Sequence, residues 1–252
     1  MSKKSLPQLY REHTGKVSHR WSLYLDVYDA AFAPWRELPV TVVEVGVQNG
    51  GSLELWGQYF KAARAIIGCD VDERCGALRF DDPRLTVIVG PINAESTARE
   101  IVARAEAIDI FIDDGSHVST DIVAAFCNYF PRMRPGGMYV AEDLHCAYHP
   151  DWQGGLSRPN AMGFFKLLVD GMHQDYWQEP AELRALAAPF LPPGAAVDVS
   201  RLAADAASIA FYDSMCFVRK RPATGWGRLG ERVVVGEEAA VDPAPLRLHG
   251  AG

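Results

Sequence analysis

Residues 109–117, DIFIDDGSH, are a short apolar run that ends in two aspartates and, a few residues later, a histidine. Residues 135–145, PGGMYVAEDLH, repeat the arrangement: a turn signal, an apolar run and then an acidic pair. Apolar runs such as 108–112 and 138–141 are typical of buried parallel strands. The carboxyl ends of parallel strands meet at one edge of a sheet, which is where open α/β sheets bind ligands. We therefore expect both acidic clusters, and the histidine, at one ligand-binding edge.

The surrounding sequence alternates between strand-like and helix-like segments. Apolar residues recur at helical spacing over 21–35, and 40–45 is a β-branched, apolar run that predicts a buried strand. The alternation predicts βαβ units and hence a Rossmann-like, doubly wound α/β fold. The other expected elements of this part are strands at 65–71 and 85–89 and helices at 53–63, 94–107 and 118–130.

The pattern changes after residue 142. A long loop over 145–160 and a helix over 161–174 follow the second acidic cluster directly, so we expect residues 145–180 to cover the site as a lid. A short helix is expected over 179–188. Two short strands, 208–212 and 215–220, are separated by Asp213 and Ser214, which predicts an antiparallel hairpin at the edge of the sheet.

The sequence pattern predicts three parts of the chain. Residues 1–20 are expected to form an irregular polar arm, residues 21–221 the main domain, and residues 222–252 an extension that is either flexible or clasps another surface. A homo-oligomer assembled through the arm or the helix at 21–35 is left open.

Composition excludes several classes of function. The formal net charge of −7 gives no electrostatic reason to bind nucleic acid or an anionic membrane. No apolar stretch approaches the roughly 20 residues of a membrane helix, and the first residues lack the apolar core of a secretory signal. Five cysteines without a CxxC pair argue against a disulfide framework or a structural zinc site. We therefore expect a cytoplasmic protein with reduced cysteines.

The loop after the first strand indicates the type of cofactor. It contains the sequence EVGVQNGG (44–51), in which Glu44 precedes Gly46 by two residues. A carboxylate there would repel a pyrophosphate but suits a positively charged cofactor without phosphate, such as S-adenosylmethionine. Gly46 and Gly50 allow close approach of the cofactor, and Asp70, ending the next strand, can accept hydrogen bonds from a ribose diol. The predicted cofactor-binding residues are Glu44, Gly46, Gly50, Ser52, Asp70 and Asp113.

The acidic clusters predict a divalent cation and a base. Asp114, Glu142 and Asp143 offer the oxygen ligands that Mg²⁺ prefers, and a cation makes a coordinated alcohol more acidic. A neutral His117 could then take the proton as the oxygen attacks the methyl group. His145 is a second candidate for assisting the base or contacting the acceptor, although a surface role is the stronger alternative for it.

Two further assignments remain open from the sequence alone. Asp113 is placed equally well as a turn residue that binds the backbone, and that role is preferred over a role as a direct ligand. Several aromatic side chains could form a wall for a sugar ring or an aglycone, although a place in the core is more common. These are Tyr148, Trp152, Phe164, Phe165 and Trp177.

The motifs together resemble those of class I S-adenosylmethionine-dependent methyltransferases. Within that group the chain is similar to the metal-dependent sugar O-methyltransferases of the macrolide-tailoring (macrocin and mycinamicin) type. The resemblance runs from about residue 21 to residue 220. It is carried by VEVGVQNGGSLELW (43–56), IIGCDVD (66–72), DIFIDDGSH (109–117), PGGMYVAEDLH (135–145) and SIAFYDSMCFV (208–218).

The resemblance has definite implications. It implies a seven-stranded sheet whose last strand is antiparallel, magnesium held by Asp114, Glu142 and Asp143, and His117 as the base. It also implies that the methyl acceptor is a hydroxyl of a sugar or a glycosylated natural product. The chain departs from the family at Gly90-Pro91-Ile92-Asn93, where the family often carries an acidic, polar loop that contacts adenine.

Three other functions compete with this one. A catechol-type O-methyltransferase would use the same chelation of a diol by the metal, with an aromatic acceptor. A nicotinamide-dependent oxidoreductase is disfavoured because the chain lacks the G-x-G-x-x-G pattern and has a carboxylate at Glu44. A binding scaffold without activity is disfavoured by the intact set of acids and histidine.

Overall fold

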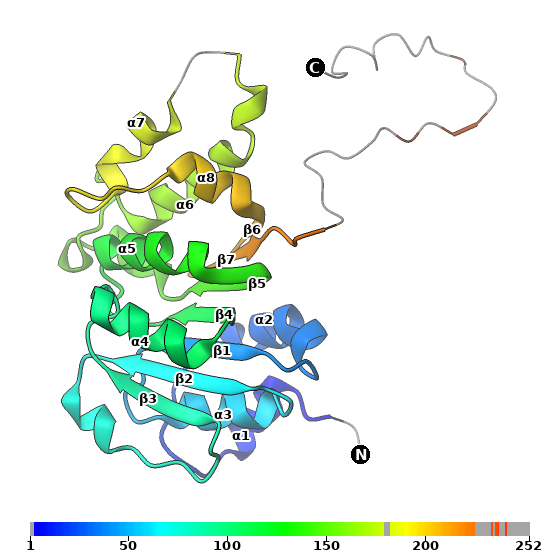
Figure 1. Ribbon diagram of the computed structural model, residues 1–252, viewed down its shortest axis with the longest axis vertical. Helices are drawn as coiled ribbons and strands as arrows, with labels where there is room; N and C mark the ends of the chain where they lie inside the picture. Colours follow the sequence, from blue (N-terminus) through cyan, green and yellow to red (C-terminus); the bar gives the residue numbers. More distant parts are fainter. Residues whose placement is uncertain (1–2, 179–181, 225–232, 234, 237–239, 241–252) are drawn as a thin grey trace.

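The computed structural model describes residues 3–178, 182–224, 233, 235–236 and 240. Within this part of the chain, seven strands form one sheet in the order β3-β2-β1-β4-β5-β7-β6. The first five strands along the chain are parallel, and β7 is antiparallel to both β5 and β6, which confirms the predicted fold (Figure 1). The strands are β1 (Thr41–Val45), β2 (Ala65–Asp70), β3 (Leu85–Val89), β4 (Ile108–Asp113), β5 (Met133–Ala141), β6 (Ala206–Tyr212) and β7 (Met215–Lys220).

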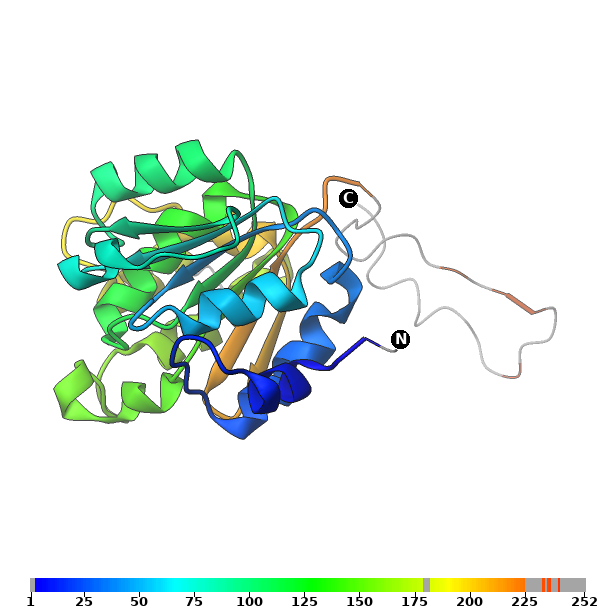
Figure 2. The ribbon, with the colours of Figure 1, turned by 90° about the horizontal axis from the view of Figure 1, so that it is seen from below.

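Helices cover both faces of the sheet, as in a doubly wound fold (Figures 1 and 2). One face carries α1 (Leu6–Glu12), α2 (Ser22–Phe32) and α3 (Gly51–Tyr59). The other face carries α4 (Glu95–Ala105), α5 (Ser119–Tyr129), α6 (Ala161–Met172), α7 (Leu183–Ala187) and α8 (Val199–Asp205). None of the helices in the described part of the chain combines the length and the apolar composition needed to cross a bilayer.

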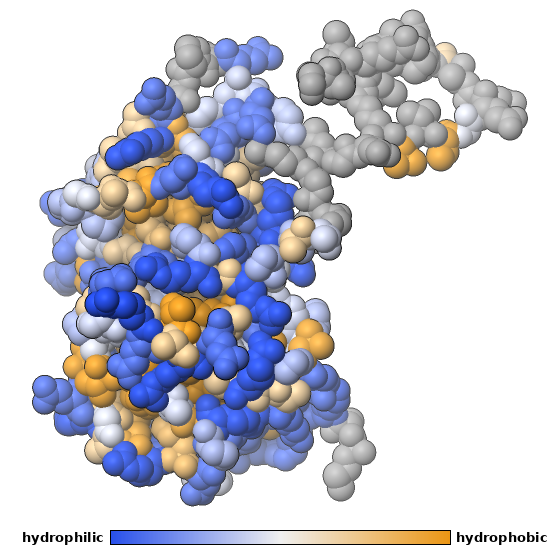
Figure 3. Space-filling view, in the orientation of Figure 1, coloured by the Kyte–Doolittle hydropathy of each residue, from blue (hydrophilic) through white to orange (hydrophobic). Residues whose placement is uncertain are grey.

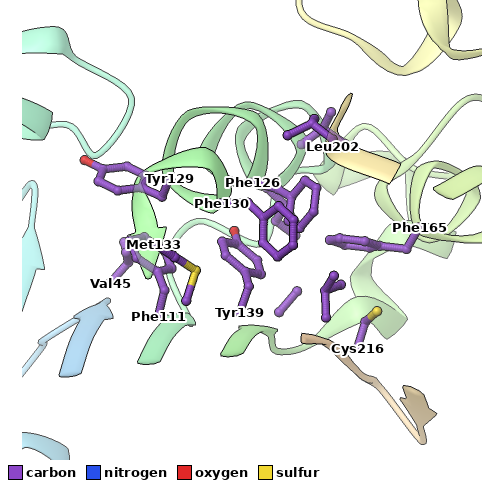
Figure 4. Close-up of a cluster of buried hydrophobic side chains, with 14 of the residues drawn as sticks. Val45, Phe111, Phe126, Tyr129, Phe130, Met133, Tyr139, Phe165, Leu202 and Cys216 are labelled. Atoms are coloured by element: carbon purple, nitrogen blue, oxygen red, sulfur yellow. The ribbon is translucent and has the colours of Figure 1, made fainter. Parts of the chain in front are cut away.

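Successive side chains of each strand point to opposite faces, so the sheet separates two hydrophobic cores. Val43 packs in one core and Val42 in the other. On the face shown in Figure 4, the rings of Phe111 and Tyr139 stack with their centroids 5.1 Å apart, beneath Phe126 of α5. On the outside, hydrophilic and hydrophobic residues are interspersed over the face shown in Figure 3.

The N-terminal arm is not irregular as expected, because it contains α1. Ser5 caps this helix in a reciprocal capping box with Gln8, a local signal that the sequence carries but that the prediction overlooked. The helix contacts α2 and α3. The helix α8 was also missed, and the turn expected at 135–137 lies inside β5, where Gly136 adopts a φ of 84°.

The chain between α1 and α2 crosses the start of α3. Glu54 accepts hydrogen bonds from the backbone N and the Nζ of Lys16, at 2.8 and 2.7 Å. A Cβ atom at Gly51 would lie 2.2 Å from the carbonyl oxygen of Lys16, so only glycine allows this approach. The crossing brings residues 17–21 to the same sheet edge as the acidic clusters. Most of the extension expected over 222–252 lies outside the described residues.

Candidate active site

A pocket of about 350 Å³ opens at the carboxyl ends of β1, β2 and β4. Of the predicted cofactor-binding residues, Gly46, Asp70 and Asp113 line it. The loop after β3, Gly90–Asn93, forms part of the wall. The pocket is therefore placed at the sheet edge where the sequence predicted the cofactor.

Asp70 fixes the loop that follows β1. Its Oδ2 accepts hydrogen bonds from the backbone N of Val47 at 2.8 Å and of Gln48 at 2.9 Å. Its Oδ1 accepts from the backbone N of Asp72 at 3.0 Å. One carboxylate thus holds two loops in register while lining the pocket.

The two glycines of this loop have different roles. Gly46 has a φ of 89°, and a Cβ there would lie 2.0 Å from the carbonyl oxygen of Asp114, so its lack of a side chain lets the loops after β1 and β4 touch. Gly50 precedes α3 with a φ of 83°. A Cβ at Gly50 would meet Phe80 at 3.0 Å and Leu78 at 3.2 Å, not the pocket. Gly50 therefore lies outside the wall of the first pocket, and its expected close approach to the cofactor stays a prediction.

Glu44 and Ser52 lie behind the pocket rather than in its wall. The Glu44 side chain is fully buried. Its Oε2 accepts from Ser52 Oγ at 2.5 Å, and its Oε1 accepts from Trp56 Nε1 at 2.9 Å and from Arg20 at 2.7 Å. The geometry makes Glu44 an internal anchor between β1, α3 and the N-terminal arm.

Asp113 is buried at the end of β4. Its Oδ2 accepts a hydrogen bond from the Tyr139 hydroxyl at 2.7 Å. Burial raises the pKa of Asp113 to about 7, although the Tyr139 hydroxyl and the backbone of Gly115 oppose the rise. Asp113 therefore combines a structural hydrogen bond with a place in the pocket wall.

A second pocket, of about 380 Å³, adjoins the first. Both pockets are lined by Gln48 and Asp114, so the two spaces meet at these residues. The other residues that line the second pocket are His19, Arg20, Trp21, Tyr24, His117, Glu142 and Asp143. This wall brings the predicted base and metal ligands together with residues of the N-terminal arm.

Three of the predicted residues form a group that could hold a metal ion. Ligand atoms of Asp114, His117 and Asp143 all lie within 4.8 Å of one another. Asp143 adopts a left-handed conformation with a φ of 52°, and it accepts a hydrogen bond from the Tyr24 hydroxyl at 2.7 Å. Two carboxylates suit a hard divalent cation.

His117 is held close to Asp143. Its Nε2 lies 3.5 Å from Asp143 Oδ2, and its buried Nδ1 has no hydrogen-bond partner among the described residues. Burial lowers the pKa of His117, and the nearby carboxylate of Asp143 only partly offsets this effect. The imidazole is therefore neutral near pH 7. One of its two ring nitrogens can then accept a hydrogen bond or a proton from a bound molecule.

Glu142 has a different environment from the other predicted ligands. It is 1 % exposed, and its Oε1 accepts a hydrogen bond from the Tyr28 hydroxyl at 2.5 Å. Both of its carboxylate oxygens accept from Arg20 Nε, at 3.0 and 3.1 Å. It lies outside the three-residue group.

His145 lies beside the second pocket rather than in its wall. Its Nδ1 is 2.5 Å from Ser214 Oγ, and its ring packs edge-on against Trp21 with centroids 6.4 Å apart. Of the aromatic residues for which a pocket wall was the alternative to a place in the core, Phe164 and Phe165 are fully buried in the core, as preferred. The aromatic side chains that do line the pocket, Trp21 and Tyr24, come from the start of α2.

Residues 43–144 match a family model described as a methyltransferase domain. This part of the chain is a methyltransferase domain. The loops that follow β1, β2, β4 and β5 and line the two pockets all lie within it. It therefore contains every predicted cofactor-binding and metal-binding residue.

Relatives with curated names are sugar O-methyltransferases. The chain is 35% identical over 221 residues to 8-demethyl-8-alpha-L-rhamnosyl tetracenomycin-C 2'-O-methyltransferase of Streptomyces olivaceus, covering 83% of this chain and 54% of the relative. It is 37% identical to demethylmacrocin O-methyltransferase of Streptomyces fradiae, covering 59% of this chain and 40% of the relative. The chain therefore spans about half or less of the length of these relatives.

A solved structure has the same fold. MycE methyltransferase from the mycinamycin biosynthetic pathway, in complex with Mg and SAH, superposes with a TM-score of 0.70 and 26% sequence identity. The match covers 88% of this chain and 55% of that chain. These likenesses favour methyl transfer over the nicotinamide-dependent alternative.

The sequence did not predict the pocket-lining residues that precede residue 43, the start of the methyltransferase domain. Arg20, Trp21 and Tyr24 line the second pocket, yet they precede β1 and belong to no recognisable motif. A buried arginine in a polar arm gives no local signal, because its partners are distant in the sequence. Trp21 stands at the start of the helix expected over 21–35, and its side chain is 63% exposed.

Proposed function

We propose that this chain is an S-adenosylmethionine- and magnesium-dependent O-methyltransferase that acts on a sugar hydroxyl of a small molecule. The observation that carries the proposal is the junction of the two pockets at Gln48 and Asp114. A cofactor in the first pocket and an acceptor in the second would meet there, beside the predicted base. Positioning of this kind accounts for much of the rate of an in-line transfer.

The donor set fits the two absent groups. When bound, S-adenosylmethionine supplies an electrophilic methyl group and Mg²⁺ lowers the pKa of a hydroxyl that it coordinates. Asp70, which lines the first pocket, would accept hydrogen bonds from the ribose diol. Asp114 and Asp143 would hold the cation, since they supply carboxylate oxygens within one group.

His117 is assigned as the general base. Its neutral imidazole lines the second pocket, where it can accept the proton of the acceptor hydroxyl. Tyr24 orients Asp143 through its hydroxyl, and Tyr28 does the same for Glu142. His145 is assigned to the pocket rim, where it supports the ring of Trp21.

The acceptor class is proposed from the relatives and from the pocket. The relative from Streptomyces olivaceus is named for a 2'-O-methylation of a rhamnosyl group, and another, from Micromonospora griseorubida, is mycinamicin VI 2''-O-methyltransferase. The exposed ring of Trp21 offers a flat apolar surface that suits the C–H face of a sugar. A catechol would also suit this ring, so the acceptor must be tested directly.

The test has two stages. Calorimetric titration with S-adenosylhomocysteine, with magnesium and with chelator, should show binding that is largely independent of the metal. Methyl transfer from labelled S-adenosylmethionine should then be measured with a rhamnoside and with a catechol, each with and without chelator. Absence of nucleoside binding would overturn the methyltransferase assignment. Turnover of an acceptor that survives full chelation would overturn the role of the metal, and preference for catechol would overturn the sugar class.

A further inference from the structure

Arg20 inserts a buried cation into the acidic cluster. Its side chain is 2% exposed, although the residue belongs to the polar N-terminal arm. Its Nη2 donates to Glu44 Oε1 at 2.7 Å and to Asp114 Oδ2 at 3.0 Å, and its Nε donates to both oxygens of Glu142. One guanidinium therefore connects the carboxyl ends of β1, β4 and β5.

The remaining surroundings of Arg20 keep it in place. Its Nη1 donates to the Tyr10 hydroxyl at 3.1 Å. Its Cζ lies 5.6 Å from the ring centroid of Trp56 and 5.8 Å from that of Tyr28. Burial alone would lower the pKa of Arg20, but the carboxylate of Glu142 and the other neighbouring groups raise it well above its usual value. The side chain is thus a permanent positive charge in a site of low exposure.

This charge is required by its neighbours. The side chains of Glu44 and Glu142 are almost completely buried, and Asp114 is 23% exposed. Three carboxylates around one point repel one another unless a cation lies between them, and removal of one partner from a buried ion pair is strongly destabilising. Arg20 is the side chain that supplies this cation in the described part of the chain.

Asp114 links Arg20 to the predicted metal position. Its Oδ2 accepts from Arg20, and the residue also belongs to the group with His117 and Asp143. Glu142, in contrast, directs both oxygens to Arg20 and one also to Tyr28. The acidic cluster therefore has two places for positive charge, one filled by the guanidinium and one beside Asp143.

We propose that Arg20 is a positioning residue that acts as a resident counter-ion: it orients Asp114 and Glu142 and keeps the acidic cluster folded before a divalent cation binds. The inference rests on the proposed function in one respect, because the divalent cation is taken to be the Mg²⁺ proposed there. It predicts that a neutral residue at position 20 makes the stability of the protein depend on added metal, because the metal then takes over the neutralisation of the carboxylates.

The test compares Arg20→Met with Arg20→Lys, and uses Arg11→Met on the exposed face of the same arm as a control. Thermal unfolding is followed in chelator and in Mn²⁺, which prefers the same carboxylate oxygen ligands as Mg²⁺. Arg20→Met should lower the Tm in chelator and regain more than half of the loss in Mn²⁺, whereas the wild type should gain much less. The Tm of Arg20→Lys in chelator should lie between that of Arg20→Met and that of the wild type, because an ammonium keeps the charge but cannot bridge three carboxylates. Arg11→Met should behave as the wild type.

A double variant separates charge from packing. If repulsion between carboxylates is the cause, adding Glu142→Gln to Arg20→Met should raise the Tm in chelator, because it removes one of the carboxylates that Arg20 no longer neutralises. An equal Tm loss in chelator and in Mn²⁺, with no recovery in the double variant, would show that Arg20 only fills space and would overturn the inference. Failure of the wild type to bind Mn²⁺ by calorimetry would instead count against the metal in the proposed function, and the double variant would still decide the role of Arg20.

Discussion

Substitution of Asp70 by asparagine gives a direct test of where the cofactor lies. The carboxylate accepts three backbone hydrogen bonds, from Val47, Gln48 and Asp72, and lines the first pocket. Asparagine is nearly isosteric but neutral, and it offers only one acceptor oxygen. If that oxygen keeps the bonds from Val47 and Gln48, the amide NH₂ must face the N–H of Asp72. Two of the three backbone hydrogen bonds are then kept, the third is replaced by a contact between two donors, and the anionic acceptor for the ribose diol is lost.

The size of the effect follows from that loss. A hydrogen bond to a charged group contributes about 1.5–3 kcal/mol, and about 1.4 kcal/mol corresponds to a tenfold change in Kd. Asp70→Asn should therefore raise the Kd for S-adenosylhomocysteine by roughly 10- to 100-fold. Asp70→Ala should raise it further and also lower the Tm, because three backbone N–H groups lose their acceptor.

Calorimetric titration with S-adenosylhomocysteine measures the change, and thermal unfolding without ligand shows whether the loop has been damaged. Asp81→Asn, an exposed position in the loop before β3, is the matched control and should leave the Kd unchanged. If Asp70→Asn binds as tightly as the wild type and has an unaltered Tm, the carboxylate does not contact the nucleoside, and the ribose must lie elsewhere.

Other substitutions test the base, the acceptor surface and the frame of the sheet. His117→Ala should reduce turnover about 100-fold while the Kd for S-adenosylhomocysteine stays unchanged, since a base acts only in the transition state; unaltered turnover would remove it from the mechanism. Trp21→Ala should raise the acceptor KM in steady-state kinetics, whereas Leu23→Ala, at an exposed position nearby, should not; equal effects would refute the platform. Lys220→Met should lower the free energy of unfolding by about 3 kcal/mol, because the Nζ donates to three backbone carbonyls near the start of β5. Denaturation by guanidinium chloride, with the exposed Lys166→Met as control, measures this loss, and equal stability of the two variants would contradict it.

Local sequence patterns determined the fold and the position of the site. The apolar runs at 108–112 and 138–141 predicted β4 and β5, and alternation with helices predicted a parallel sheet, which the register of the strands confirms. Residues that follow parallel strands must share one edge, so Asp70, Asp114 and Asp143 could be placed together before their contacts were known. The antiparallel hairpin of β6 and β7 was predicted for the same reason: its signals are local.

Tertiary structure alone decided which of the acids face a metal position and which face a protein cation. Arg20 meets Glu142 across 122 positions of the sequence and Asp114 across 94. No periodicity or motif records such a pairing, because it depends on how α1 and the following segment cross α3 and bring the arm to the sheet edge. A carboxylate at a strand end is therefore predictable from sequence, but its partner is set by packing between distant segments, and in this protein that partner distinguishes Glu142 from Asp143.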